Sequence, residues 1–144
     1  MSLIHATCIA IAGTGIVIRG ASGAGKSDLA LRLIEGGAAL VADDYCEAKA
    51  KDGRLTLTAP AAIAGRMEVR GYGIVRMPRR RAVKAGLVVD LMPEAEIPRT
   101  PETTTCIIEG VTLPWLAVDA FSASAAAKVR LAVRGLSENL RVVP

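Results

Sequence analysis

Aromatic residues are scarce in this chain of 144 residues, which has one Trp, two Tyr and one Phe. Proteins that bind single-stranded nucleic acid stack successive bases on several aromatic side chains, and this sequence cannot supply such a platform. The formal charge of +4 is mild. Its densest basic cluster could equally receive phosphate groups or an acidic protein surface. We therefore expect no nucleic-acid partner. The cluster consists of Arg76, Arg79, Arg80, Arg81 and Lys84.

Paired cysteines and long apolar segments are also lacking. Cys8, Cys46 and Cys106 are odd in number, far apart and without a CxxC spacing. This pattern argues against a zinc site or a disulfide framework and favours buried free thiols in a reducing compartment. The apolar N-terminal region is interrupted by Arg19 before it could span a bilayer. We expect a cytoplasmic protein without a membrane segment, folded as a single domain over residues 1–144.

One glycine-rich stretch matches the phosphate-binding loop pattern, in which two glycines five positions apart precede Lys and Ser. An apolar run at 15–18 precedes it, and a helical pattern with leucines follows and ends at Gly36-Gly37. Strand, loop and helix are the context that this motif requires. The alternative is an ordinary glycine-rich turn between a strand and a helix. The residues are Gly20, Ala21, Ser22, Gly23, Ala24, Gly25, Lys26 and Ser27.

Such a loop predicts a site for the polyphosphate of a nucleotide. Its glycines turn backbone N–H groups inward, and the following helix adds partial positive charge at its N-terminus. Lys26 would contact the β- and γ-phosphate oxygens, and the Ser27 hydroxyl would ligate Mg²⁺. We therefore expect ATP and Mg²⁺ as ligands.

Two adjacent carboxylates, Asp43 and Asp44, follow a short apolar run at 38–42. Enzymes with a phosphate-binding loop commonly place a magnesium ligand or a catalytic base at such a strand end. The alternative is a turn with two solvated aspartates.

The remaining pattern predicts an α/β fold with few helices and a mixed β-sheet rich in hairpins. We expect strands at 3–11 and 14–19 joined at Gly13-Thr14-Gly15, at 45–50 and 54–58 around a turn at Lys51-Asp52-Gly53, within 67–75 on either side of a Gly-x-Gly bend, at 86–92, and at 103–108 and 111–113. Residues 60–65 are expected to be a connector or one helical turn, and 93–101 a loop. Helices are expected at 26–36 and at 123–134, the second capped by Ser122 and ending before Gly135.

Two further features have no single interpretation from the residues alone. His5 lies in the first apolar run, where a lone histidine is usually a packed or surface residue. Glu68 and Arg70 share a strand face beside a tight bend. They form either an exposed pair of opposite charges or part of a site.

The sequence resembles the catalytic domain of the bacterial HPr kinase/phosphorylase family, whose members act on a serine of the phosphocarrier protein HPr. The resemblance covers residues from about 3 to about 113. Its most discriminating part is the last segment, which is close to the family's Glu-Ile-Arg-Gly-x-Gly-Ile signature. The matching elements are His5, the loop from Gly20 to Ser27, Ala42-Asp43-Asp44, and Glu68-Val69-Arg70-Gly71-Tyr72-Gly73-Ile74-Val75.

This resemblance implies a phosphate-binding-loop fold of the phosphoenolpyruvate carboxykinase type and a role for each matched residue. Lys26 would hold the phosphates, Ser27 and Glu68 the Mg²⁺, and one of the two aspartates would be the base toward the incoming serine. His5 would lie beside the transferring phosphoryl group. The docking segment for HPr would include Arg70, Gly71, Tyr72 and Gly73. Family members usually carry an additional N-terminal domain and assemble as hexamers, so we expect a short form and a homo-oligomer.

One departure from the family concerns the reverse reaction, the phosphorolysis of phosphorylated HPr. The family's Gly-Arg-Asn step, whose arginine serves dephosphorylation, should follow near Pro114. This chain instead reads Pro114-Trp115-Leu116-Ala117-Val118-Asp119, without an arginine. The resemblance therefore supports the kinase reaction and leaves phosphorylase activity open. Two other functions remain as alternatives: a small-molecule kinase with a phosphate-binding loop, and a nucleotide-sensing partner that transfers no phosphate.

Overall fold

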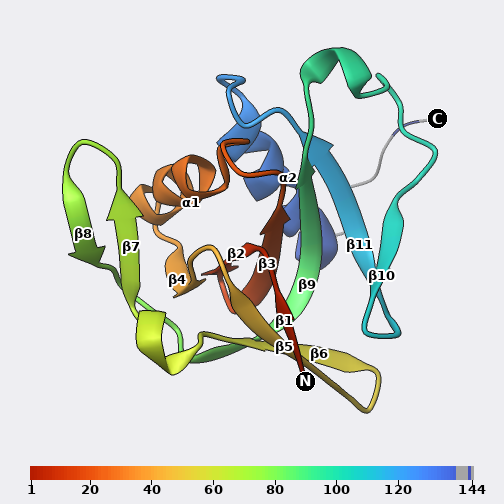
Figure 1. The fold of residues 1–144 in the computed structure, drawn as a ribbon. Helices are drawn as coiled ribbons and strands as arrows, with labels where there is room; N and C mark the ends of the chain where they lie inside the picture. Colours follow the sequence, from red (N-terminus) through yellow and green to blue (C-terminus); the bar gives the residue numbers. More distant parts are fainter. Residues whose placement is uncertain (139–142, 144) are drawn as a thin grey trace.

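The computed structural model describes residues 1–138 and 143. Its main feature is a mixed β-sheet, curled strongly into a half-barrel, with two helices, α1 (Lys26–Glu35) and α2 (Ala125–Glu138), on one face (Figure 1). A two-stranded arm projects beside α1. Within the described residues, neither helix is long and apolar enough to cross a membrane.

The strands and two short 3₁₀ turns follow one another closely along the chain. They are β1 (Ser2–Ile4), β2 (Thr7–Ile11), β3 (Thr14–Arg19), β4 (Ala39–Ala42), β5 (Cys46–Lys51), β6 (Arg54–Thr58), η1 (Ala61–Ile63), β7 (Arg66–Val69), β8 (Gly73–Arg76), β9 (Ala82–Leu91), η2 (Glu94–Glu96), β10 (Thr105–Ile108) and β11 (Val111–Val118).

The ten-residue strand β9 organises the main sheet, whose order is β1-β5-β6-β9-β3-β2-β4. One edge of β9 pairs in parallel with β3. The other edge pairs first with β6, antiparallel, and then with β11, in parallel. Because β3, β9 and β11 run in the same direction, their carboxyl ends meet at one edge of the sheet, which is where ligands bind in open α/β sheets.

Alternation along the strands fills a core on both faces of the sheet. Ile16 and Ile18 of β3 pack toward the helices with Leu29 and Leu33 of α1. Val17, between them, faces the opposite cluster, which β5, β6, β10 and β11 help to build. Cys8 and Cys46 are buried there as free thiols, as expected, and Cys106 is half-buried and also free.

Local signals explain most of these elements. The β2–β3 turn has positive φ at Ala12 and Gly13, 48° and 82°, as a two-residue hairpin loop requires. Helix α1 ends as expected at the glycine pair. Gly37 takes φ 111° and donates to Ile34 O at 2.9 Å, and Ala38 N donates to Leu33 O at 3.0 Å. This is the hydrogen-bond pattern of a Schellman cap.

Several predicted boundaries were wrong. The first apolar run is divided into β1 and β2 around His5. Strand β9 starts at Ala82 rather than 86, because Val83 and Ala85 alternate inward while Lys84 points outward. Strand β11 continues through Pro114 to Val118, since its ladder to β9 begins only at Trp115 and does not need the missing N–H.

The second helix also differs from the prediction. It starts at Ala125, and Ser124 rather than Ser122 occupies the position before its first turn, accepting from Lys128 N at 2.8 Å through its carbonyl. Gly135 does not end the helix. Buried Ala125, Val129 and Val133, spaced four residues apart, hold it against the core, which offsets the roughly 1 kcal/mol that glycine costs in a helix.

Candidate active site

The glycine-rich loop joins the end of β3 to the start of α1, as predicted. Gly23 and Gly25 have φ values of 82° and 97°, which non-glycine residues rarely adopt. The helical hydrogen bond nearest the loop runs from Leu29 N to Gly25 O at 2.9 Å. The N–H groups of residues 26–28 therefore have no carbonyl partner within the helix and are directed at the loop, a geometry suited to an anion.

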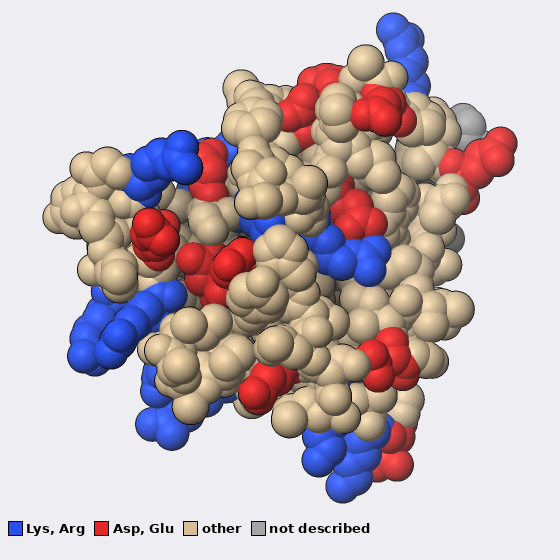
Figure 2. Space-filling model, viewed as in Figure 1, with Lys and Arg blue, Asp and Glu red and all other residues tan. Residues whose placement is uncertain are grey.

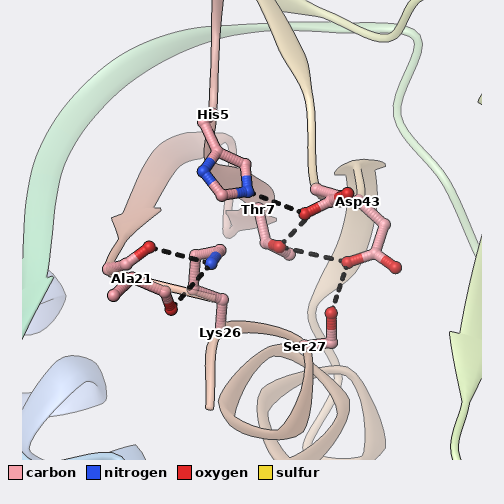
Figure 3. A network of polar contacts seen from close by, with 8 residues as sticks. His5, Thr7, Ala21, Lys26, Ser27 and Asp43 are labelled. Atoms are coloured by element: carbon pink, nitrogen blue, oxygen red, sulfur yellow. Dashed lines mark hydrogen bonds and ion pairs between the residues drawn. The ribbon is translucent and has the colours of Figure 1, made fainter. Parts of the chain in front are cut away.

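Lys26 is nearly buried, with 7% of its surface exposed. Its ammonium group donates to the carbonyls of Gly20 at 2.9 Å and Ala21 at 3.2 Å (Figure 3). No carboxylate pairs with it among the described residues. A buried cation held only by neutral carbonyls is poorly compensated, so a polyanion in the loop would complete its environment.

Asp43 connects this loop to the neighbouring strand. Its Oδ1 accepts a hydrogen bond from Ser27 Oγ at 2.7 Å and another from Thr7 Oγ1 at 3.1 Å. Thr7 Oγ1 in turn accepts from Asp44 N at 3.2 Å. Thr7 is fully buried on β2, which pairs with β4, so the strand pairing brings Thr7 beside Asp43 and Asp44, while Ser27 reaches Asp43 from the first turn of α1 (Figure 3).

Asp44 points to a different partner, His5. Asp44 Oδ1 lies 3.0 Å from His5 Nε2, and both side chains are open to solvent, 60% and 44% exposed. Asp44 adopts a left-handed backbone conformation with φ 69°, which turns its side chain away from that of Asp43. The ring of Tyr45 stacks at a tilt against His5, with centroids 5.1 Å apart. One carboxylate of the pair thus faces the loop serine and the other faces solvent.

Glu68 lies on the arm formed by β7 and β8, and its side chain is exposed. Among the described residues, no three His, Cys, Asp or Glu side chains gather as metal ligands, so the structure does not bring Glu68 together with the aspartate pair. Figure 2 nevertheless shows acidic side chains on this face gathering between the arm and the main sheet.

The donors around Ser27 suit Mg²⁺. The Ser27 hydroxyl and an Asp43 carboxylate oxygen lie 2.7 Å apart, and both are hard oxygen ligands. Mg²⁺ in phosphoryl-transfer sites is held by one or two carboxylates plus phosphate oxygens and water rather than by a protein cage. The absence of a three-ligand cluster in the described residues is therefore compatible with this metal.

Comparison with known proteins assigns the family. A family model described as the HPr serine kinase C-terminal domain matches residues 1–92. The chain belongs to the HPr kinase/phosphorylase family. It is 44% identical over 75 residues to the HPr kinase/phosphorylase of Clostridium tetani, covering 52% of this chain and 25% of that protein. The corresponding protein of Clostridium kluyveri strain ATCC 8527 is 47% identical over 72 residues, 50% of this chain and 23% of that protein. The match thus spans about a quarter of the length of these curated relatives.

The solved structure of the Hpr(Ser) kinase/phosphatase from Coxiella burnetii extends the likeness beyond residue 92. It shares 25% sequence identity with this chain at a TM-score of 0.84, covering 96% of this chain and 98% of that chain. The fold similarity therefore includes β10, β11 and α2, which lie outside the segment matched by the family model.

In this HPr kinase family member, the structure joins four of the residues predicted for the site, His5, Ser27, Asp43 and Asp44, in one hydrogen-bonded network. Lys26 lies beside that network but is turned to the loop carbonyls. The prediction missed Thr7, which bridges the two aspartates. Its position two residues after His5, as a polar residue in an otherwise apolar run, was the available signal.

A second network, also missed, lies beneath the loop of this family member. Arg19, immediately before Gly20, donates through Nε and Nη2 to the two carboxylate oxygens of Asp90, both at 2.8 Å. Trp115 Nε1 donates to the same carboxylate at 2.7 Å. These contacts join the carboxyl ends of β3, β9 and β11. Burial by itself would raise the pKa of Asp90, but the hydrogen bonds from Arg19 and Trp115 and the charge of Arg19 hold that pKa below its usual value.

We expect Asp90→Asn to lower the free energy of unfolding at pH 7 by about 1–2 kcal/mol, because it removes hydrogen bonds to a charged, half-buried group. A depressed pKa means that the folded state binds the proton less readily than the unfolded state does. The stabilisation by the Asp90 carboxylate is therefore complete above pH 3.8, the ordinary pKa of the group. It is lost as the pH falls through the lower pKa that the group has in the folded state.

Urea unfolding at pH 7 and at about pH 3 measures this effect, with Asp52→Asn in the exposed β5–β6 turn as the matched control. The stability difference between the unmodified chain and Asp90→Asn should narrow in acid. A difference that stays constant across this range would contradict the assignment.

Proposed function

We propose that this chain transfers the γ-phosphoryl group of ATP to a seryl hydroxyl of an HPr-like phosphocarrier protein. The observation that carries the proposal is the hydrogen-bonded path from loop residue Ser27 through Asp43 and Thr7 to Asp44 and His5. The path connects a carboxylate that faces solvent to a glycine-rich loop of the phosphate-binding pattern, which supports a role in phosphoryl transfer. Phosphoryl transfer needs little beyond positioning, charge neutralisation and a base.

The loop would position the donor. Its inward N–H groups and the Lys26 ammonium would bind the β- and γ-phosphates, with Lys26 exchanging its carbonyl partners for phosphate oxygens. Ser27 and Asp43 would hold Mg²⁺, and Glu68 would join them as a further ligand only when the arm moves toward the loop. When bound, Mg²⁺ would neutralise charge that develops between the β- and γ-phosphates.

Asp44 is the better placed of the two aspartates to act as the base. Asp43 already accepts from two hydroxyls, Ser27 and Thr7, and faces the loop. Asp44 is exposed, so an incoming serine can reach it. His5, 3.0 Å away, would hold the carboxylate in place and lie beside the transferring group. Asp44 would accept the hydroxyl proton as the new P–O bond forms.

The β7–β8 arm would be the docking surface for the protein substrate. Its bend contains Arg70, Gly71, Tyr72 and Gly73, and the Tyr72 and Ile74 side chains are 84% and 72% exposed. Exposed large apolar side chains on a projecting element are typical of a protein contact. The neighbouring arginines, Arg79, Arg80 and Arg81, border a pocket of about 170 Å³ and would meet acidic groups of the partner.

The kinase direction is the one we propose. The segment that should carry the family's arginine for dephosphorylation lies on β11, where Trp115 is hydrogen-bonded to Asp90 and no arginine is present. A phosphoenolpyruvate carboxykinase-type fold, a cytoplasmic location and a homo-oligomer of six copies belong to the same proposal. Light scattering on the purified chain would test the last.

Mass spectrometry of HPr after incubation with this chain, ATP and Mg²⁺ tests the proposal directly. We expect HPr to gain one phosphoryl group, 80 Da by covalent mass, on a serine, and an HPr variant with alanine at that serine to remain unmodified. Unmodified HPr together with phosphorylation of a small molecule in a substrate panel would favour the small-molecule kinase. ATP binding without any transfer would favour a nucleotide-sensing role.

A further inference from the structure

A small pocket lies on the far side of the phosphate-binding loop from the aspartate pair. Its volume is about 200 Å³, below the roughly 300–1,000 Å³ of pockets for drug-sized ligands, so it suits a single ring system. It lies at the carboxyl ends of β9 and β11, and one loop residue contributes to its wall. The lining residues are Ala24, Leu91, Met92, Pro93, Asp119, Ala120 and Phe121.

Phe121 is the only phenylalanine in the chain, and it is 73% exposed. A large aromatic side chain in water loses the stabilisation that burial would bring. Its ring lies against the loop, because a Cβ added at Gly25 would be 3.5 Å from two of its ring atoms. The ring therefore stands open to solvent immediately beside the loop.

The segment that carries Phe121 is fixed from both sides. The Asp119 carboxylate accepts from Phe121 N at 2.9 Å and from Glu94 N at 3.1 Å. The Arg32 guanidinium, from α1, donates to the carbonyls of Ala120 and Ser122. These contacts hold the backbone on both sides of Phe121 in place, so the segment needs little further ordering when a ligand packs on the ring.

The order of the strands in the sheet fixes where the pocket lies relative to the aspartate pair and the phosphate-binding loop. The strands run β4-β2-β3-β9, with β11 beside β9. The aspartates follow β4, the phosphate-binding loop follows β3, and the pocket follows β9 and β11. The phosphate-binding loop thus lies between the aspartate pair and the pocket. A triphosphate held by the loop with its γ-phosphate toward Asp44 must direct its nucleoside toward Phe121.

We propose that this pocket binds the base of the nucleoside triphosphate, with the base stacked on the ring of Phe121. The inference rests on the proposed function for the position of the phosphates. The Asp119 carboxylate already accepts two backbone hydrogen bonds, so the pocket offers the base an apolar wall and one aromatic face. Stacking on an aromatic side chain contributes about 1–3 kcal/mol per base.

Comparing ATP with inorganic tripolyphosphate separates the base from the phosphates. We expect calorimetry in Mg²⁺ to show that the unmodified chain binds ATP more tightly than tripolyphosphate. Phe121→Ala should weaken ATP binding by about 5- to 150-fold, the range that corresponds to 1–3 kcal/mol, and leave tripolyphosphate affinity unchanged. Phe121→Trp should retain ATP affinity, since it preserves the stacking face. Ile107→Ala, an exposed apolar residue on β10, is the matched control.

Each contrary outcome identifies what failed. Equal weakening of ATP and tripolyphosphate by Phe121→Ala would mean that the ring supports the loop, and would overturn the base site. Equal affinity of the unmodified chain for ATP and tripolyphosphate would also overturn the base site. So would a failure of the unmodified chain to bind either ligand. If HPr is not phosphorylated but the selective effect of Phe121→Ala on ATP persists, the base site is supported and only the proposed transfer fails.

Discussion

Lys26→Ala should abolish phosphoryl transfer from ATP to HPr, with a loss of at least about 10³-fold in kcat/KM. The Lys26 ammonium is nearly buried, and its hydrogen bonds within the described part of the chain go to the Gly20 and Ala21 carbonyls. In a site of low dielectric, a point charge of this kind stabilises charge on the transferring group far more than it would in water. Initial rates with labelled ATP measure the loss.

The control for this variant is Lys49→Ala, which removes an exposed lysine of β5 outside the site. Lys49→Ala changes the net charge by the same amount as Lys26→Ala and should leave the rate of phosphoryl transfer unchanged. Thermal unfolding of both variants checks that the fold persists. Near-normal transfer by a folded Lys26→Ala protein would contradict the placement of the phosphates.

Asp44→Asn should lower kcat by about 10²- to 10⁴-fold while the dissociation constant for ATP changes little, because general-base catalysis typically contributes this much. The substitution is conformationally mild. Asp44 has φ 69°, and asparagine adopts left-handed backbone as readily as aspartate. The amide can also still contact His5, so the main loss is the ability to accept the serine proton.

Asp43→Asn is the comparison that separates the two roles. Asp43 Oδ1 accepts from Ser27 and Thr7, so its loss should raise the Mg²⁺ concentration needed for half-maximal rate and weaken MgATP binding. Rates measured over a Mg²⁺ titration, together with calorimetry of MgATP, distinguish the variants. The opposite result would have two parts: Asp43→Asn would lower kcat without changing the Mg²⁺ dependence, and Asp44→Asn would change the Mg²⁺ dependence without lowering kcat. That result would make Asp43 the base and Asp44 the metal ligand.

The features that could be predicted from sequence depend on neighbouring residues. The phosphate-binding loop, the Gly36-Gly37 helix end and the turn at Asp52-Gly53 each follow from glycine conformation and short-range hydrogen bonds. The same holds for the position of Asp43 and Asp44, which follow directly from a short buried strand.

The features that escaped prediction depend on pairing between distant segments. Nothing near Trp115 indicates that β11 pairs in parallel with β9, so the predicted strand at 111–113 stops before Pro114 and is too short. Phe121 gains its position from Arg32, which is 89 residues earlier in the chain. The family signature predicts Glu68 as part of the site, whereas the structure has it on the separate β7–β8 arm.

The parallel arrangement of β3, β9 and β11 has a consequence for synthesis of the protein on the ribosome. The loop, the lysine and both aspartates have been synthesised once about 45 residues are made, but β3 then lacks its partner β9, and β9 in turn lacks β11 until Val118 has been added. The nascent chain therefore carries every residue that we propose to bind phosphate long before it can hold these residues in place. A nucleotide bound at the proposed site would stabilise the fold only after translation has nearly finished.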